Sequence, residues 1–257
     1  MIWCGIDAGA RATKVVILGA GRAILARALC RSGPDPAATC GALYEEALVQ
    51  AGRRREEVSA VVATGYGRGS VAFASRIVTE MTCHARGVRH LLPEARTIVD
   101  IGGQDSKIIF LDPNGMVRDF AMNERCAAGT GRFLEVLADI VRVPLERMAE
   151  AAVRAKSPAA ISSTCAVFAE SEVVGLLSKG RAAEDVVAGV HEALAKRVVS
   201  LCRGIRAVPP IAFTGGVALN TGMVAALSRT LGEEVIVPEH PQTTGALGAA
   251  LIARREA

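Results

Sequence analysis

Two stretches of the chain follow the same order of apolar and polar positions. Residues 6–18 read IDAGARATKVVIL, and residues 99–111 read VDIGGQDSKIIFL. Each copy contains the end of an apolar strand, an Asp, a turn with Gly, a small hydroxyl residue, a Lys and a second apolar run. The pattern predicts two β-hairpins whose Gly-containing tips expose backbone N–H groups.

The two predicted tips are candidate phosphate-binding loops. Backbone N–H groups at a tight turn bind anions, and a neighbouring Asp can hold the metal ion that accompanies phosphate. Gly in a single hairpin is usually explained by turn geometry alone. Two copies with Asp, Gly, hydroxyl and Lys in one register are hard to explain in that way, so phosphate binding is favoured.

The same pattern of apolar runs divides the chain into two halves, residues 1–95 and 96–257. In the first half we expect strands at Ile2–Ile6, Thr13–Leu18, Ala23–Leu29 and Val58–Ala63. One helix is expected from an Asp35 cap to Gln50, with Gly52 just past its end. A second is expected over Thr82–Leu92, stopped by Pro93.

The second half repeats this order with insertions. The expected strands are Thr97–Ile101, Lys107–Leu111, Val117–Met122, Ile211–Thr214 and Val235–Val237. The expected helices are Gly131–Val141, Leu145–Ala152, Ala166–Ser178, Ala183–Arg206, Thr221–Leu231 and a closing helix near Gly245–Arg254. The turn sequence Asp-Pro-Asn-Gly at residues 112–115 separates two of the strands.

Two β-β-β-α-β-α halves with Gly turns pointing inward resemble the actin-like ATPase architecture. This is the ribonuclease H-like, α/β fold of sugar kinases, Hsp70 chaperones and actin (the ASKHA superfamily), built around a nucleotide cleft. The turn at residues 7–14 resembles the first phosphate loop of that superfamily, and the turn at 100–105 resembles the second. Residues 213–220, FTGGVALN, resemble its adenosine motif.

This resemblance implies a set of residues for Mg²⁺ and ATP. Asp7 and Asp100 would hold Mg²⁺ through its waters, Lys14 would counter β/γ-phosphate charge, and Gln104 would orient the attacking water. The expected ATP contacts are Gly9, Ala10, Arg11, Ala12, Thr13, Lys14, Gly102, Gly103, Gln104, Gly215, Gly216, Asn220, Gln242 and Gly245.

Two features of these loops leave alternatives open. Lys14 and Lys107 are read either as phosphate ligands or as solvated strand starts, with the functional interpretation favoured for Lys14 and the structural one for Lys107. Relatives often carry Ser-Thr after the loop Gly, whereas this chain has Ala10-Arg11, which removes a hydroxyl contact to phosphate. Arg11 is a candidate replacement ligand.

Composition limits the remaining function classes. The chain has 257 residues, 51% of them hydrophobic but only 4% aromatic, which predicts an aliphatic core suited to α/β layers. Lys+Arg 30 against Asp+Glu 26 is too balanced to indicate a nucleic-acid partner. No stretch reaches the length of a membrane span, and the N-terminus enters a strand directly, so we expect a cytoplasmic protein with no membrane partner.

The seven cysteines fall into two groups. Cys4, Cys30, Cys40 and Cys202 lie in apolar segments and are expected in the core, as is Cys83, although His84 follows it. Cys126 and Cys165 instead lie in small, polar surroundings just before predicted helices, where thiolates are stabilised. A [4Fe–4S] cluster generally needs four thiolates, which a two-fold dimer with the cluster on its axis would supply.

Three segments carry a more specific resemblance, which extends over essentially the whole chain. Residues 122–135 read MNERCAAGTGRFLE, residues 161–173 read ISSTCAVFAESEV, and residues 99–107 read VDIGGQDSK. They resemble the ATP-dependent activators (component A) of 2-hydroxyacyl-CoA dehydratases, in the BadF/BadG/BcrA/BcrD ATPase family. Residues 81–87 and 241–248 also fit this family.

The resemblance implies a homodimer in which Cys126 and Cys165 of both subunits hold one [4Fe–4S] cluster. Reduced ferredoxin or flavodoxin would charge the cluster. ATP binding and hydrolysis would change the angle between the subunits, so that one low-potential electron passes to a 2-hydroxyacyl-CoA dehydratase. The dehydratase would use this electron to form a ketyl radical.

Three alternatives remain at this stage. The ATPase subunits of benzoyl-CoA reductases are similar, and there the ligand pairs would come from different chains of a hetero-oligomer. A small-molecule kinase on the same fold would lack a cluster, but 257 residues leave little room for its substrate domain. A non-redox module, such as an actin-like filament or a regulatory nucleotide-binding subunit, would be colourless. Both cysteine motifs in one short chain favour the homodimeric activator.

Overall fold

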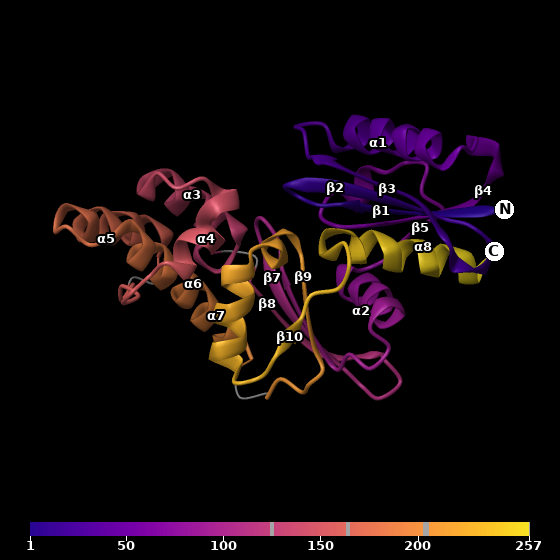
Figure 1. The fold of residues 1–257 in the computed structure, drawn as a ribbon. Coiled ribbons are helices and arrows are strands. Elements are labelled where there is room, and N and C mark those ends of the chain that lie inside the picture. Colours follow the sequence, from indigo (N-terminus) through magenta and orange to yellow (C-terminus); the bar gives the residue numbers. More distant parts are fainter. Residues whose placement is uncertain (124–125, 163–164, 203–205, 257) are drawn as a thin grey trace. The chain divides into compact units, whose positions relative to one another are not determined.

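The structure, a computed structural model, forms two compact units (Figure 1). It describes residues 1–123, 126–162, 165–202 and 206–256. Unit 1 comprises Met1–Ala95, Leu111–Arg118 and Pro238–Ala257, and unit 2 comprises Arg96–Phe110 and Asp119–Val237. Each unit contains one five-stranded mixed sheet.

The sheet of unit 1 has the strand order β3-β2-β1-β4-β5. Its strands are β1 (Ile2–Ala8), β2 (Ala12–Leu18), β3 (Ile24–Arg31), β4 (Val58–Thr64) and β5 (Arg76–Ile77). β2 pairs antiparallel with both β1 and β3, whereas β4 pairs parallel with both β1 and β5. The helices of the unit are α1 (Pro36–Ala51), α2 (Glu80–Leu91) and α8 (Thr244–Glu256).

Both faces of β2 are covered by helices, which explains its unbroken apolar run. Successive strand residues point to opposite faces. Val15 and Ile17 belong to the core that includes the buried face of α1, whereas Val16 and Leu18 belong to the core that includes α8. Where a strand is covered on both faces, apolar residues need not alternate with polar ones, as residues 15–18 of β2 show.

The helix α8 is held unusually close to β1 and α2. A Cβ added at Gly5 would meet the backbone of α8, and one added at Gly248 would meet the backbone of Cys83 on α2. Glycine is therefore required at these positions by close approach of the backbones, not by backbone dihedral angles. This packing fixes the start of α8 against the end of β1, where Asp7 lies.

The sheet of unit 2 has the order β10-β9-β6-β7-β8. Its strands are β6 (Thr97–Ile101), β7 (Ser106–Leu111), β8 (Val117–Asn123), β9 (Ile211–Thr214) and β10 (Val235–Ile236). Its helices are α3 (Gly131–Val141), α4 (Met148–Val153), α5 (Ala166–Ser178), α6 (Ala183–Ser200) and α7 (Thr221–Leu231). β6 is antiparallel to β7 and parallel to β9.

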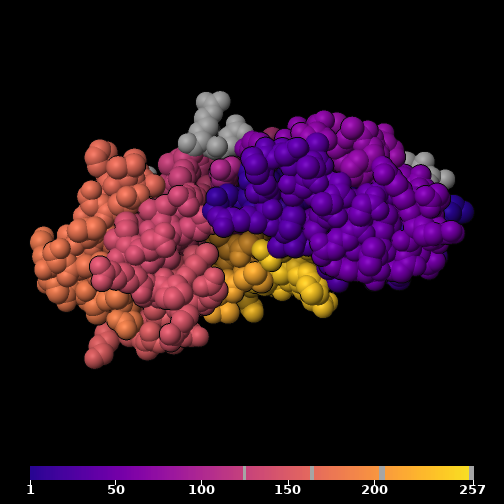
Figure 2. Space-filling model, turned by 90° about the horizontal axis from the view of Figure 1, so that it is seen from above, coloured from indigo at the N-terminus to yellow at the C-terminus, as the bar shows by residue number. Residues whose placement is uncertain are grey.

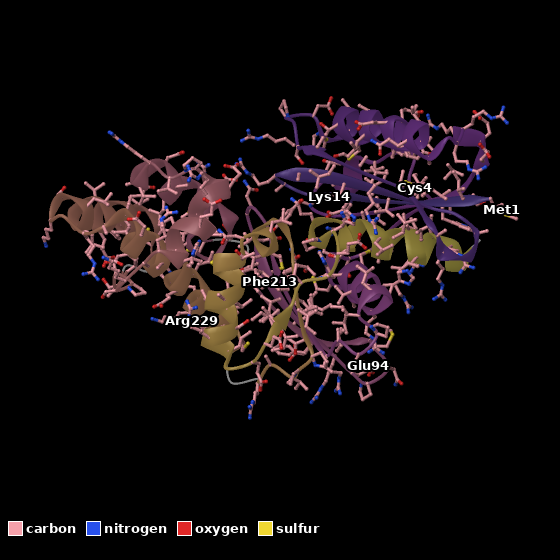
Figure 3. All side chains as sticks on the ribbon, in the orientation of Figure 1. Met1, Cys4, Lys14, Glu94, Phe213 and Arg229 are labelled. Atoms are coloured by element: carbon pink, nitrogen blue, oxygen red, sulfur yellow. The ribbon has the colours of Figure 1, made fainter. Side chains whose placement is uncertain are left out.

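The two helices α5 and α6 differ in burial. Most of α6 is buried, and the core of unit 2 forms around it and includes Phe213 of β9 (Figure 3). By contrast, α5 lies at the surface, in the orange region of Figure 2, and exposes Val167 and Phe168. An exposed apolar side of a helix marks a surface that suits contact with another chain.

Most predicted elements are confirmed, and the differences lie at their ends and connections. The closing helix, expected with the second half, belongs to unit 1 as α8. α2 begins at Glu80, two residues before the expected Thr82. β3 extends over Ile24–Arg31, β10 ends at Ile236, and the short strand β5 is not predicted by the apolar pattern.

Two predicted helices have different limits. The one expected over Leu145–Ala152 is a 3₁₀ turn, Leu145–Arg147, followed by α4. The helix expected to reach Arg206 ends at Ser200, and residues 203–205 of that prediction lie outside the described residues. No helix among the described residues is long and apolar enough to cross a membrane.

The close contact at Gly248 leads to a stability prediction. We expect Gly248→Ala to lower the free energy of unfolding by about 3 kcal/mol, because the added methyl group overlaps the backbone of α2. Gly41→Ala in α1 is the control: no atom beyond the helix's own backbone lies within 4 Å of its added Cβ, so this change should stabilise by about 0.5–1 kcal/mol. Chemical denaturation measures the free energy of unfolding of both variants. Equal changes in the two variants would contradict the close contact between Gly248 and α2.

Candidate nucleotide and cluster sites

The two hairpins of the sequence repeat have the same register in the structure. In unit 1, Asp7 pairs across the strands with Lys14. In unit 2, Asp100 pairs with Lys107 at the equivalent position. The Lys14 Nζ lies 3.0 Å from Asp7 Oδ2, and the Lys107 Nζ lies 3.7 Å from Asp100 Oδ2. The repeat therefore places an Asp–Lys ion pair beside each tip.

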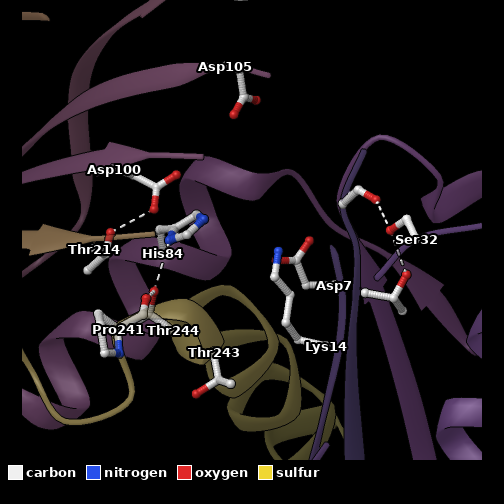
Figure 4. Close-up of polar contacts among 12 residues, drawn as sticks. Asp7, Lys14, Ser32, His84, Asp100, Asp105, Thr214, Pro241, Thr243 and Thr244 are labelled. Carbon is white, nitrogen blue, oxygen red and sulfur yellow. Dashed lines mark hydrogen bonds and ion pairs between the residues drawn. The ribbon is translucent and has the colours of Figure 1, made fainter. Parts of the chain in front are cut away.

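The repeat extends to a third strand in each unit. Thr64 lies opposite Asp7 on the parallel strand β4, and Thr214 lies opposite Asp100 on β9. Each Thr is followed by a glycine with positive φ, +92° at Gly65 and +87° at Gly215. In unit 2 the Thr214 hydroxyl donates a 2.8 Å hydrogen bond to Asp100 Oδ1 (Figure 4).

The two lysines differ in their surroundings. The side chain of Lys107 is only 2% exposed, and its Nζ lies 2.6 Å from Asp105 Oδ2. Its expected role as a solvated strand start is therefore wrong, because a buried ammonium needs such carboxylate partners. The position equivalent to Asp105 in unit 1 is Ala12, and the Lys14 side chain, 17% exposed, lies beside Asp7 (Figure 4).

A serine outside every predicted motif stabilises the first tip. The Ser32 hydroxyl donates a 2.6 Å hydrogen bond to the Gly9 carbonyl and lies 3.0 Å from the Thr13 hydroxyl (Figure 4). The backbone N–H of Ser32 donates to the Arg11 carbonyl. Because Ser32 follows β3, far along the chain from the loop, no local motif identifies it. It places a side-chain hydroxyl at a loop whose residues 10–12 are Ala, Arg and Ala.

The second tip is joined to the start of α3. The N–H groups of Gly131 and Arg132 donate to the carbonyls of Gly102 and Gly103, at 2.8 and 3.0 Å. A Cβ on Gly131 would come within 2.9 Å of the Gly102 oxygen, so the approach requires glycine. Gln104, at the tip, is exposed. The loop and the helix therefore form one hydrogen-bonded structure.

In the predicted adenosine motif, Asn220 has its polar groups engaged within unit 2. Its Oδ1 accepts from the Met223 N–H and caps α7, while its Nδ2 lies 3.2 Å from His191 Nε2. Gly215 and the 3₁₀ turn that begins at Gly216 immediately precede it. Asn220 thus fixes the turn that the motif forms at the start of α7.

The remaining predicted ATP residues lie in unit 1. Gln242 is in the 3₁₀ turn Pro241–Thr243, and Gly245 is in the first turn of α8. A Cβ added at Gly245 would lie 3.3 Å from both Asp7 Oδ2 and His84 Nε2. His84, for which the sequence pattern indicates no role, is buried, and its Nδ1 lies 3.1 Å from the Thr244 hydroxyl (Figure 4).

Four of the five cysteines expected in the core are buried. Cys4, Cys40, Cys83 and Cys202 are buried and Cys30 is half-buried; Cys4 lies in the sheet of unit 1 (Figure 3). Burial raises the pKa of the Cys83 thiol to about 12 and that of Cys40 to about 11, so neither is a ready thiolate. The remaining two, Cys126 and Cys165, are exposed.

The two exposed cysteines begin helical turns of different kinds. Cys165 is the N-cap residue of α5, as predicted. Cys126 caps the 3₁₀ turn Ala127–Gly129, which the sequence does not predict, and α3 then begins at Gly131, as predicted. The Asn123 side chain fixes this turn by accepting from the Cys126 N–H and donating to its carbonyl.

The residues beside the two cysteines limit the description of their motifs. Glu124, Arg125, Ser163 and Thr164 lie outside the described residues. Among the described residues, no group of three or more His, Cys, Asp or Glu side chains could hold a metal ion. One chain therefore offers two accessible thiols, half of the set that a cubane cluster generally needs.

His191 leads to a prediction on pH dependence. Burial, with a smaller effect of Arg229, lowers the pKa of His191 to about 4. The unfolded chain gains a proton here below about pH 6.5, whereas the folded chain resists protonation until about pH 4. The free energy of unfolding should therefore fall by about 3 kcal/mol as pH drops through this window.

Denaturation at several pH values measures this effect. His191→Gln, which retains an acceptor for Asn220, should reduce the slope, and His240→Gln at an exposed site should not. An unchanged slope in His191→Gln would show that another group causes the acid sensitivity.

Comparison with known proteins places these sites in a family context. The chain is 46% identical over 257 residues to the 2-hydroxyisocaproyl-CoA dehydratase activator of Clostridioides difficile, covering 100% of this chain and 96% of the relative. It is 46% identical over 253 residues to the activator of lactoyl-CoA dehydratase of Anaerotignum propionicum, covering 98% and 97%. Identity to a benzoyl-CoA reductase subunit of Thauera aromatica is 34% over 260 residues, covering 97% and 92%.

Solved structures agree with this placement. The C. difficile 2-hydroxyisocaproyl-CoA dehydratase activator with bound ADPNP matches at a TM-score of 0.93 and 45% identity, covering 100% of this chain and 95% of that one. Component A of the Acidaminococcus fermentans (R)-2-hydroxyglutaryl-CoA dehydratase matches at 0.94 and 41%, covering 100% and 98%. A ROK family glucokinase from Streptomyces griseus, 12% identical over 99% of this chain and 100% of its own, shares the fold at a TM-score of 0.60.

These matches show the actin-like ATPase fold that the hairpin repeat predicts. The family match covers residues 4–253 and includes both hairpins, both exposed cysteines and the start of α8. The chain therefore belongs to the BadF/BadG/BcrA/BcrD ATPase family.

Proposed function

We propose that this protein is a homodimeric iron–sulfur ATPase that activates a 2-hydroxyacyl-CoA dehydratase. In this function, ATP hydrolysis drives transfer of one low-potential electron to the dehydratase, and reduced ferredoxin or flavodoxin resupplies it. The relatives named as dehydratase activators, at 46% identity, support this choice over the benzoyl-CoA reductase type, whose relative is 34% identical. The cytoplasm is the expected compartment.

One observation carries the proposal: the loop proposed to bind phosphate and the segment with Cys126 are joined in unit 2. The carbonyls of Gly102 and Gly103 accept from the first N–H groups of α3. From there, only four residues separate Gly131 from Cys126. A nucleotide-dependent movement of the loop would therefore reach the cysteine through a short, hydrogen-bonded segment.

For the nucleotide, we assign Mg²⁺ binding through water to Asp7 and Asp100. Lys14 would bind β/γ-phosphate oxygens, because its partial exposure leaves its ammonium near the loop surface. Gln104, exposed at the second tip, would orient the attacking water. We assign the buried Lys107 a different role, which is to balance the charges of Asp100 and Asp105.

For the metal centre, the donor chemistry fits half of a [4Fe–4S] cluster. Cys126 and Cys165 are exposed soft ligands, and a second copy related by a two-fold axis would supply the other two. When bound, such a cluster supplies reversible one-electron transfer at low potential. The chain's own contribution is to hold both thiols at helical turns and to offer the exposed apolar side of α5 to the second copy.

The ATP-dependent step needs two forms of the dimer that bind nucleotide differently. We propose that the phosphate loops favour one angle between the subunits with ATP and another after hydrolysis. In unit 2 the helices α3 and α5 would act as levers, since each follows one of the cysteines.

The metal site of the nucleotide leads to a kinetic prediction. Asp100→Asn should lower the ATP hydrolysis rate by at least about 100-fold, because the amide cannot supply the charge that stabilises Mg²⁺ and the transition state. Thr214 can still donate to the amide oxygen, so the fold should survive. Asp119→Asn, at an exposed strand position, is the control. Unchanged turnover in Asp100→Asn would exclude Asp100 from the metal site.

The cluster ligands are tested by anaerobic purification with iron and sulfide analysis. We expect a brown, air-sensitive dimer with about four irons, and loss of the cluster in both Cys126→Ser and Cys165→Ser. Cys202→Ser, at a buried thiol, should retain it. Colourless or monomeric wild-type protein after iron reconstitution would reject the proposed function, and a cluster shared with a different chain would favour the benzoyl-CoA reductase type.

A further inference from the structure

One cationic side chain of unit 2 is fixed beside the segment that follows Cys126. Arg197 lies in the last turn of α6 and is partly buried. Its Nη1 donates a 3.2 Å hydrogen bond to the Ala128 carbonyl, within the turn that Cys126 caps. Its Cζ lies 4.8 Å from the centroid of the Phe133 ring on α3. Two contacts on one segment therefore orient the guanidinium group.

The same guanidinium is electrostatically coupled to both exposed cysteines. Burial lowers the pKa of Arg197, and negative charge on Cys126, Cys165 and Glu172 opposes that shift. Arginine keeps its proton at any physiological pH, so the charge at this position is constant. Arg197 thus provides one fixed cation beside the Cys126 turn, and its charge interacts with two thiols that lie on different elements.

Glu172 of α5, whose negative charge also acts on Arg197, forms hydrogen bonds with a different residue. Glu172 Oε1 accepts from both the backbone N–H and the hydroxyl of Ser162, at 2.9 and 2.8 Å. Glu172 therefore also ties the segment before Cys165 to α5. Its negative charge acts on Arg197 in the same direction as negative charge on the two thiols.

We infer that Arg197 sets the reduction potential of the proposed cluster by stabilising its reduced form. This inference rests on the proposed function and adds to it a residue that tunes the metal centre without ligating it. Reduction by one electron increases the negative charge of a thiolate-bound cluster. A fixed cation nearby favours that state and raises the potential, more strongly where burial limits screening by water and salt.

The arrangement has a functional consequence for electron uptake. In a two-fold dimer, the cluster would have one Arg197 from each subunit, so the effect is doubled. A higher potential makes reduction by ferredoxin or flavodoxin more favourable. Delivery to the dehydratase then depends on the ATP-driven change.

The test is a redox titration of the cluster, followed by electron paramagnetic resonance, on anaerobically reconstituted full-length dimers. Arg197→Gln removes the charge, Arg197→Lys retains it, and Lys196→Gln removes an exposed charge from the neighbouring position of α6. We expect a more negative midpoint potential in Arg197→Gln, and values near the wild type in the other two. If Arg197 had only a structural role, the midpoint potential of the cluster would not follow the charge of the side chain at position 197.

Other outcomes are also decisive. An unshifted midpoint in Arg197→Gln overturns the inference, and so does an equal shift in Arg197→Lys. If Arg197→Gln cannot hold the cluster, retention by Arg197→Lys supports the role of charge, and loss in both variants overturns it. Wild-type protein without a cluster would instead reject the proposed function, so the two failures are distinguishable by iron analysis of the wild type.

Discussion

The two hydrogen bonds from the start of α3 to the loop at Gly102 and Gly103 are the constraint on which the proposed mechanism depends. The first N–H groups of a helix have no partners within the helix and must find them elsewhere. Here they use carbonyls of a turn that belongs to the predicted nucleotide site. Glycine at position 131 permits this approach, since a side chain would collide with the Gly102 oxygen. A shift of the helix without the loop would break both hydrogen bonds.

The two hairpins share one arrangement of residues but differ in the burial of their lysines. Both units place an Asp–Lys pair beside the tip and a Thr-Gly turn on the next parallel strand. Among the positions at which the two hairpins differ, one has Asp105 in unit 2 and Ala12 in unit 1. The added carboxylate holds Lys107 in the interior, whereas Lys14 remains partly exposed. One substitution in the repeat thus separates a buried structural lysine from a candidate phosphate ligand.

The sequence predicts most of the fold because its signals are local. Apolar runs of strand length, the Asp35 cap and Gly52 at the end of α1 all depend on residues close in the chain, and the structure confirms them. The contrast between buried and exposed cysteines could also be predicted, since polar, small surroundings mark Cys126 and Cys165.

The remaining features depend on tertiary contacts. Ser32 contacts the first tip, and His84 contacts the start of α8. In both cases the partner is far away in the sequence, so no local motif identifies these residues. Lys107 is buried against the Asp105 carboxylate. A pattern of apolar residues predicts the strand but not this contact between side chains. Placement of α8 in unit 1 follows from glycine contacts with β1 and α2, which only the assembled sheet brings together.

The most direct test of the coupling is to compare the proposed cluster of the reduced protein with and without Mg²⁺–ADPNP by electron paramagnetic resonance. If the loop at Gly102 and Gly103 moves α3 and the Cys126 segment, the nucleotide must change the spectrum of a cluster that it does not touch. A changed signal with bound nucleotide is the predicted result. An identical spectrum with nucleotide shown to be bound would contradict mechanical coupling between the loop and the cysteines.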